Sequence, residues 1–160
     1  MLLVTRLGSS IFIRAPVEKV FGRVAQHDRC NDWLEFVSKA SYTSEQETGV
    51  GTSAHHLGQI MGRKMNWDGR IVEWVENDRI VWQANSGEPG KMRMKAVNWV
   101  KKDADGTRYG LEVEYVMPYS LLGKLMDAIK VRKAVAKSIQ KSLERLKTVI
   151  EREETLRELC

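Results

Sequence analysis

The sequence lacks the hallmarks of several protein classes. It has only two cysteines, Cys30 and Cys160, and neither lies in a CxxC pair, so we expect no disulfide framework and no zinc site. No apolar run approaches the ~18 residues that a membrane-spanning helix needs. The first ten residues contain neither a basic region nor a long apolar stretch, which predicts no signal peptide and a cytoplasmic location.

Histidine is also scarce, and no catalytic set is recognisable. His55 and His56 are adjacent in a predicted strand, so one faces inward and the other outward. Leu57, beyond them, favours His55 as the inward residue. Without an HxxxH or HExxH spacing, a metal site is not expected. No serine or threonine has a histidine partner at a recognisable spacing, so we assign no catalytic residue, no metal and no cofactor.

The excess of positive charge is local. The net charge is +5, and residues 120–150 hold eight Lys or Arg against Asp127 and Glu144. Such a run is usually a solvated helix face, and peripheral contact with an anionic membrane is the functional alternative. Nucleic acid is the less favoured partner, because residues 1–119 are nearly neutral. The basic residues of this face are Lys124, Lys130, Lys133, Lys137, Lys141 and Arg145.

One long amphipathic helix is predicted over residues 119–151. Its apolar residues recur at alternating spacings of three and four, interrupted only at Arg132, which places them on one stripe about nine turns long. Residues 151–160 form a charged helical extension. The stripe consists of Leu122, Leu125, Ile129, Ala136, Ile139, Leu143, Leu146 and Ile150.

The chain before this helix is predicted to form seven strands and two short helices. A strand over residues 9–15 is followed by Pro16, which suits the first turn of a helix. Asp28 is a candidate N-cap of a second short helix whose Trp33, Phe36 and Val37 face inward. Period-two patterns then predict strands over residues 39–45, 53–60, 64–75, 79–84, 91–101 and 108–117.

This order of elements resembles the START-like superfamily, the helix-grip or SRPBCC fold. The resemblance is carried by Ile-Phe-Ile-Arg-Ala-Pro-Val-Glu-Lys-Val-Phe at residues 11–21, Trp33, Gly-Val-Gly-Thr at 49–52 and the segment from Trp67 to Trp82. It is strongest to the polyketide cyclase/dehydrase and coenzyme Q-binding branch. The resemblance implies an α+β fold in one domain of residues 1–160, with a core at about 9–150. In it a curved, seven-stranded antiparallel sheet wraps around the long C-terminal helix.

The resemblance also implies an apolar cavity between sheet and helix, and aromatic and methionine residues on the strands suit its lining. Plain core packing is the alternative interpretation of the same residues. Strand parity assigns Val97 and Trp99 to one face, which we take as inward. The predicted ligand-binding residues are His55, Leu57, Met65, Trp67, Trp82, Trp99, Tyr115, Met117, Tyr119, Leu122, Met126 and Ile129.

The glycine-rich segment 47–52 has three interpretations. It lacks the Lys-Ser/Thr ending of a phosphate loop, and a strand follows it instead of a helix. A flap over the cavity mouth is the better functional interpretation. A hairpin turn whose glycines need positive φ is favoured over both.

Three functions remain open. The first is a carrier or sensor that binds a small hydrophobic molecule such as a lipid, a quinone or a polyketide-like compound. The second is a cyclase, aromatase or dehydratase acting on a polyketide-like substrate. The third is an interaction protein that acts on a ribosome or another assembly through the basic helix face and the extension. The sequence decides neither the ligand nor the oligomeric state.

Overall fold

The computed structural model describes residues 2–88, 93–118 and 125–160, and these confirm the predicted architecture. The strands are β1 (Leu2–Ile13), β2 (Val37–Tyr42), β3 (Ser53–Ile60), β4 (Arg63–Val75), β5 (Arg79–Glu88), β6 (Arg93–Asp103) and β7 (Gly106–Pro118). The helices are α1 (Val17–Ala25), the 3₁₀ helix η1 (His27–Asp32) and α3 (Leu125–Glu158).

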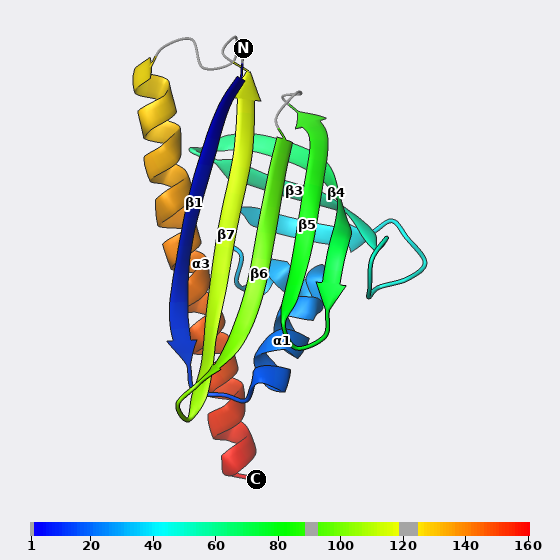
Figure 1. Ribbon diagram of the computed structural model, residues 1–160, viewed down its shortest axis with the longest axis vertical. Coiled ribbons are helices and arrows are strands. Elements are labelled where there is room, and N and C mark those ends of the chain that lie inside the picture. Colours follow the sequence, from blue (N-terminus) through cyan, green and yellow to red (C-terminus); the bar gives the residue numbers. More distant parts are fainter. Residues whose placement is uncertain (1, 89–92, 119–124) are drawn as a thin grey trace.

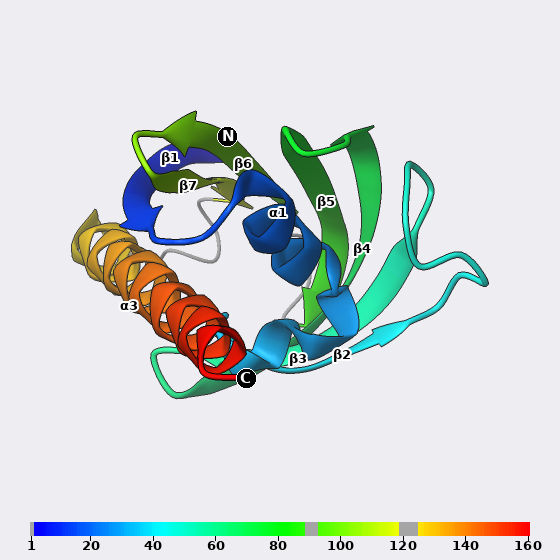
Figure 2. The same ribbon diagram turned by 90° about the horizontal axis from the view of Figure 1, so that it is seen from below.

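All seven strands form one antiparallel sheet in the order β1-β7-β6-β5-β4-β3-β2. The first and last strands of the chain are neighbours, and β2 to β7 follow one another as hairpins. The sheet curves around α3, with α1 and η1 beside the lower half of the helix (Figures 1 and 2). This is the helix-grip fold.

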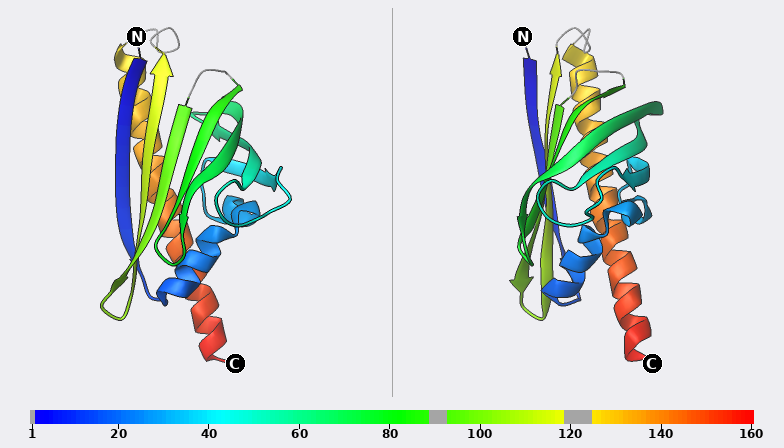
Figure 3. Two further views of the ribbon diagram at one scale, coloured as in Figure 1. Left: turned by 45° about the vertical axis from the view of Figure 1, so that its right-hand side comes forward. Right: turned by 90° about the vertical axis from the view of Figure 1, so that its right-hand side faces the viewer.

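Several boundaries differ from the predicted ones. β1 begins at Leu2, because it pairs with β7 along its whole length, from Leu2 opposite Pro118 to Ile13 opposite Thr107. The second short helix is a 3₁₀ turn that starts after Gln26 with no side-chain cap, so the predicted cap at Asp28 is wrong. α3 continues to Glu158, and its last turns extend beyond the end of the sheet (Figure 3).

The core is built where the second half of α3 meets the sheet and α1. Ile139, Leu143, Leu146 and Ile150 are buried, together with Val20, Phe21 and Val24 of α1 and with Trp33. The predicted apolar stripe does not face the core in the first half of α3, where Ile129 is 49% exposed and Ala136 is exposed. Ile139 follows Ile129 by ten positions, which corresponds to a rotation of about 1000° along an α-helix. The two side chains therefore point about 80° apart around the helix axis. Val131 and Val135 pack against the core instead.

The segment between β2 and β3 is a glycine turn. Gly49 and Gly51 have φ values of 84° and 96°, a region in which other residues are strained. The Gln46 amide crosses the turn and donates to the carbonyl oxygens of Thr48 and Val50, each at 3.0 Å. β3 follows, so no helix N-terminus is present to hold a phosphate. The turn lies on the side of the molecule opposite α3 in Figure 2, which gives no support to a flap beside that helix.

Gly58 of β3 is required by close packing, which gives a first prediction. A Cβ atom there would lie 2.0 Å from the Phe36 carbonyl oxygen and 3.0 Å from Cη2 of Trp67. Because backbone must move to admit it, Gly58→Ala should lower the free energy of unfolding by about 1–3 kcal/mol in urea denaturation. The matched control is Gly22→Ala on the exposed side of α1, where nothing lies within 4 Å. That substitution should raise stability by about 0.5–1 kcal/mol. Equal stability of the two variants would contradict the packing.

Candidate functional site

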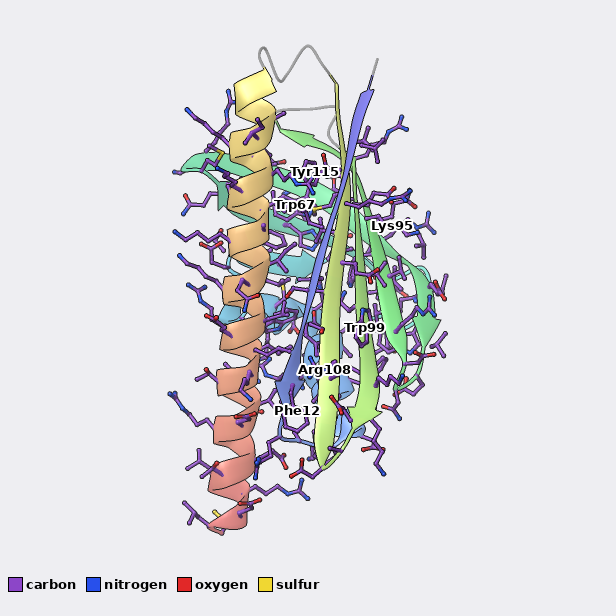
Figure 4. All side chains as sticks on the ribbon, turned by 60° about the vertical axis from the view of Figure 1, so that its left-hand side comes forward. Phe12, Trp67, Lys95, Trp99, Arg108 and Tyr115 are labelled. Carbon is purple, nitrogen blue, oxygen red and sulfur yellow. The ribbon has the colours of Figure 1, made fainter. Side chains whose placement is uncertain are left out.

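A cavity of about 300 Å³ lies between the first half of α3 and the sheet. α3 contributes mainly small side chains here, and the sheet contributes β6, β7 and the turn between β3 and β4. In Figure 4, Trp67 and Tyr115 lie between α3 and the sheet. The wall consists of Glu35, Phe36, Gln59, Ile60, Met61, Gly62, Met94, Val113, Tyr115, Val131, Ala134, Val135, Lys137, Ser138, Ile139 and Lys141. We call this space the outer cavity.

A second space of about 50 Å³, walled mainly by buried residues, is called the inner chamber. Phe36 and Met94 belong to the walls of both spaces, so the two adjoin at these side chains. Among the described residues, no Asp, Glu, Lys or Arg lines the inner chamber. Its wall consists of Val24, His27, Trp33, Leu34, Phe36, Val37, His56, Trp67, Gly69, Trp82, Gln83, Ala84, Met94, Ala96, Asn98 and Leu111.

Two buried histidines face each other in the wall of the inner chamber. Their Nε2 atoms are 2.6 Å apart, His27 coming from η1 and His56 from β3. His27 stacks on Trp82 with ring centroids 3.9 Å apart, and His56 stacks on Trp67 with an interplanar angle of 4°. Both imidazoles are therefore held in place by aromatic rings as well as by each other.

Burial keeps this pair neutral. Removal from water disfavours the charged imidazole, which lowers the pKa of His27 to about 3 and that of His56 to about 4. For His27 the neighbouring His56 lowers the pKa further. Two neutral rings share a single hydrogen between their Nε2 atoms, so one ring donates and the other accepts.

Asn98 of the chamber wall is paired. Its Oδ1 accepts a hydrogen bond from the Tyr109 hydroxyl at 2.6 Å, and burial raises the pKa of Tyr109 well above its usual value. Nδ2 of Asn98 donates to the Ile80 carbonyl oxygen at 3.4 Å. By contrast, the buried atoms Nδ1 of His56 and Nε1 of Trp33 have no well-aligned hydrogen-bond partner in the described part of the chain, although the Trp67 backbone interacts with the His56 ring and offsets part of the lowering of its pKa. Unpaired buried polar atoms are rare and call for an explanation.

The structure places some of the predicted ligand-binding residues in these walls. Trp67 and Trp82 line the inner chamber, and Tyr115 lines the outer cavity. Met65 is half-buried and belongs to neither wall. Met117 and Met126 fall within β7 and α3, while Tyr119 and Leu122 lie outside the described residues.

Four predicted positions are corrected. His55 lies on the outward face of β3 with its Nδ1 2.7 Å from the Asp68 carboxylate, and His56 is the inward residue. Leu57 is 43% exposed, because the buried face of β3 carries Ala54, His56 and Gly58.

Trp99 also lies outward, since its neighbours Asn98 and Val100 are the buried ones (Figure 4). Gly110 on β7 makes room for the indole, because a Cβ there would lie 1.9 Å from the ring. Ile129, the fourth, is exposed as described above.

Several wall residues are not predicted by the sequence. His27 comes shortly after α1, and its inward position depends on a 3₁₀ turn that no periodicity reveals. Asn98 and Met94 share the inward face of β6, which parity assigns to Trp99. The inward positions predicted for Trp33, Phe36 and Val37 do agree with the structure, because all three line the chamber.

The basic face of α3 is exposed where the structure describes it. Lys137 and Lys141 border the outer cavity, and Lys130, Lys133 and Arg145 are exposed on the same helix. Contact of this face with a membrane or an assembly stays a prediction. Among the described residues, no three His, Cys, Asp or Glu side chains gather as a metal site would require. No helix in the described ranges has the length and apolar character needed to span a membrane.

Comparison with known proteins identifies the family. Residues 5–151 match the model of the family described as polyketide cyclase/dehydrase and lipid transport. The chain belongs to this family. A search of curated proteins found no match.

Solved structures share the fold at low identity. The protein TTHA0849 from Thermus thermophilus is 20% identical, with a TM-score of 0.77 over 91% of this chain and 97% of that one. The Zhui aromatase/cyclase from Streptomyces sp. R1128 is 15% identical, with a TM-score of 0.77 over 94% and 95% of the two chains. The major latex-like protein 151 of Panax ginseng is 14% identical, with a TM-score of 0.62 over 86% and 95%. Family membership supports the general expectation of a protein that binds a small hydrophobic molecule.

The histidine pair predicts how stability depends on pH. Below pH 6.5 the unfolded chain takes up protons on His27 and His56 that the folded chain does not bind, so the free energy of unfolding falls as pH decreases toward 4. The contribution of His56 to this loss is at most about 3 kcal/mol.

Urea denaturation at pH 7 and pH 4.5 measures this loss. His56→Phe should lose less stability on acidification than the unsubstituted protein, while the exposed neighbour substitution His55→Phe keeps the buried pair and its pH dependence. Contributions of the carboxylates are common to the variants and largely cancel. The same acid loss in His56→Phe as in the unsubstituted protein would contradict the assignment.

Proposed function

We propose that this protein is a carrier or sensor that binds one small, mostly apolar molecule in the outer cavity, with one end of the molecule in the inner chamber. The observation that carries the proposal is the pair of adjoining spaces between α3 and the sheet. The outer cavity, at about 300 Å³, is at the lower end of the range of small-molecule sites. Its wall is mainly aliphatic, aromatic and methionine side chains, which suits an apolar ligand.

The polar groups near the outer cavity support binding more than chemistry. Glu35 contributes the only carboxylate among the described wall residues, and it accepts a hydrogen bond from the Ser138 hydroxyl at 2.5 Å. The backbone N–H of Glu35 donates to Oγ of Ser142 at 3.0 Å. These bonds fasten the segment after η1 to α3, so Glu35 has a structural partner on the helix.

An enzyme, a cyclase or dehydratase on a polyketide-like substrate, is the second candidate, for which the buried histidine pair would supply the proton acceptor. A neutral imidazole in an apolar chamber can accept a proton from a bound substrate. The aromatase/cyclase title of one relative is consistent with this chemistry. The test is turnover of an aromatic polyketide analogue. Activity that the His56→Phe substitution abolishes while binding persists would establish the enzyme. An analogue that binds but is not converted would favour the carrier.

Blocking the outer cavity tests the binding proposal. Ala134 lines the cavity from α3, so Ala134→Trp should fill it and weaken binding of the neutral dye N-phenyl-1-naphthylamine at least about tenfold in a fluorescence titration. Ala136 is exposed on the same helix and belongs to neither wall, so Ala136→Trp is the matched control with unchanged affinity.

Equal affinities of the two variants would place the dye elsewhere, and no binding by the unsubstituted protein would contradict the proposal. Native mass spectrometry of freshly purified protein, followed by organic extraction, would identify a molecule carried at one per chain.

A further inference from the structure

The wall of the inner chamber includes buried polar atoms without a well-aligned partner and, among the described residues, no Asp, Glu, Lys or Arg. The atoms are Nδ1 of His56, whose ring also has the Trp67 backbone nearby, and Nε1 of Trp33; their residues are 4% and 1% exposed. Leaving such an atom unpaired costs about 1–3 kcal/mol, so a bound molecule that supplies a partner recovers that free energy. The shared wall at Phe36 and Met94 places this chamber next to the outer cavity.

The contact between the two histidines defines what that partner must be. If His56 supplies the hydrogen to Nε2 of His27, then Nδ1 of the neutral His56 ring is an acceptor. If His27 supplies it, the hydrogen of His56 is on Nδ1, which is then a donor. A hydroxyl group both donates and accepts, so it pairs with His56 in either tautomer. A ketone or ether oxygen only accepts, and pairs in one tautomer alone.

The rest of the chamber wall agrees with a hydroxyl group. Nε1 of Trp33 is a donor only, and a hydroxyl oxygen that donates to His56 can still accept a hydrogen bond. No lysine or arginine in the described part of the chain lines the chamber, so a carboxylate or phosphate there would lack a counter-charge from these residues and be buried at high cost. The basic side chains of the site, Lys137 and Lys141, border the outer cavity instead.

We propose that the inner chamber is a subsite for a neutral hydroxyl group, alcohol or phenol, at the end of the apolar ligand, and that Nδ1 of His56 binds it. The volume of about 50 Å³ holds a few water molecules, and so a polar end group, but no second ligand. The indoles of Trp67 and Trp82 and the imidazoles stacked on them give the subsite aromatic walls, which suit a phenol. This inference rests on the proposed function, because it assumes that the body of the ligand occupies the outer cavity.

Three probes of equal ring size test the subsite: naphthalene, 2-naphthol and 2-naphthoate. Titration calorimetry should show 2-naphthol binding at least about tenfold more tightly than either of the others. His56→Phe should remove this preference while it retains the affinity for naphthalene. The control His55→Phe, on the outward face of the same strand, should keep the preference. The second measurement needs no variant: the ¹⁵N signal of His56 Nδ1 should shift on binding 2-naphthol and stay unchanged with naphthalene.

The outcomes separate this inference from the proposed function. Equal affinities for naphthalene and 2-naphthol, or an unchanged Nδ1 signal with bound 2-naphthol, overturn the hydroxyl subsite and leave the cavity proposal intact. Tightest binding of 2-naphthoate also overturns the subsite, because it places the polar end at the lysines of the outer cavity. Failure of all three probes to bind overturns the cavity proposal and the subsite together.

Discussion

The burial of only part of α3 against the sheet that curves around it is the constraint on which the rest of the structure depends. Ile139, Leu143, Leu146 and Ile150 fill the space between helix and sheet, and α1 closes that end. The preceding turns present smaller side chains such as Ala134, Val135 and Ser138 to the same sheet. Because the sheet also lies against these preceding turns but bulky side chains fill the space only around the later ones, a space remains beside the first half of α3. The cavity thus follows from the distribution of side-chain size along one helix.

The inner chamber depends on a different balance, between burial and hydrogen bonding. Two histidines and an asparagine are buried in a wall that is mainly apolar, and each has at least one partner or an aromatic ring against it. Burial makes the charged forms of the histidines unfavourable, so their polarity is that of neutral donors and acceptors. In the proposed function such a wall discriminates among ligands by hydrogen-bonding pattern, whereas the exposed lysines of α3 at the edge of the outer cavity would act through their charge.

Sequence periodicity together with the family resemblance was sufficient for the architecture but not for the site. The seven strands and the long helix follow from period-two and helical patterns, and the antiparallel sheet that wraps around the helix follows from the resemblance. The predicted directions of individual side chains were wrong at β3 and β6, where His56 and Asn98 point inward and Leu57 and Trp99 point outward. Hydropathy assigns polar residues to the surface, but a chamber that binds a polar group needs them inside. The pocket for Trp99 is created by Gly110 on another strand, a relation that no local pattern contains.

Membership of the family and likeness to solved structures establish the fold, but carriers and enzymes of one fold differ in wall chemistry. In this chain the feature of the wall that bears on the choice between carrier and enzyme is the histidine pair. A hydroxyl group held by a neutral imidazole is simply bound if its proton is far less acidic than the imidazolium. If the bound group is acidic, transfer of its proton to His56 would place a charge in a chamber that disfavours one, and the shared hydrogen would pass part of that charge to His27. The low pKa of both rings makes this transfer costly and favours binding over proton abstraction. The same burial that keeps His56 neutral therefore weighs toward the carrier and against the enzyme.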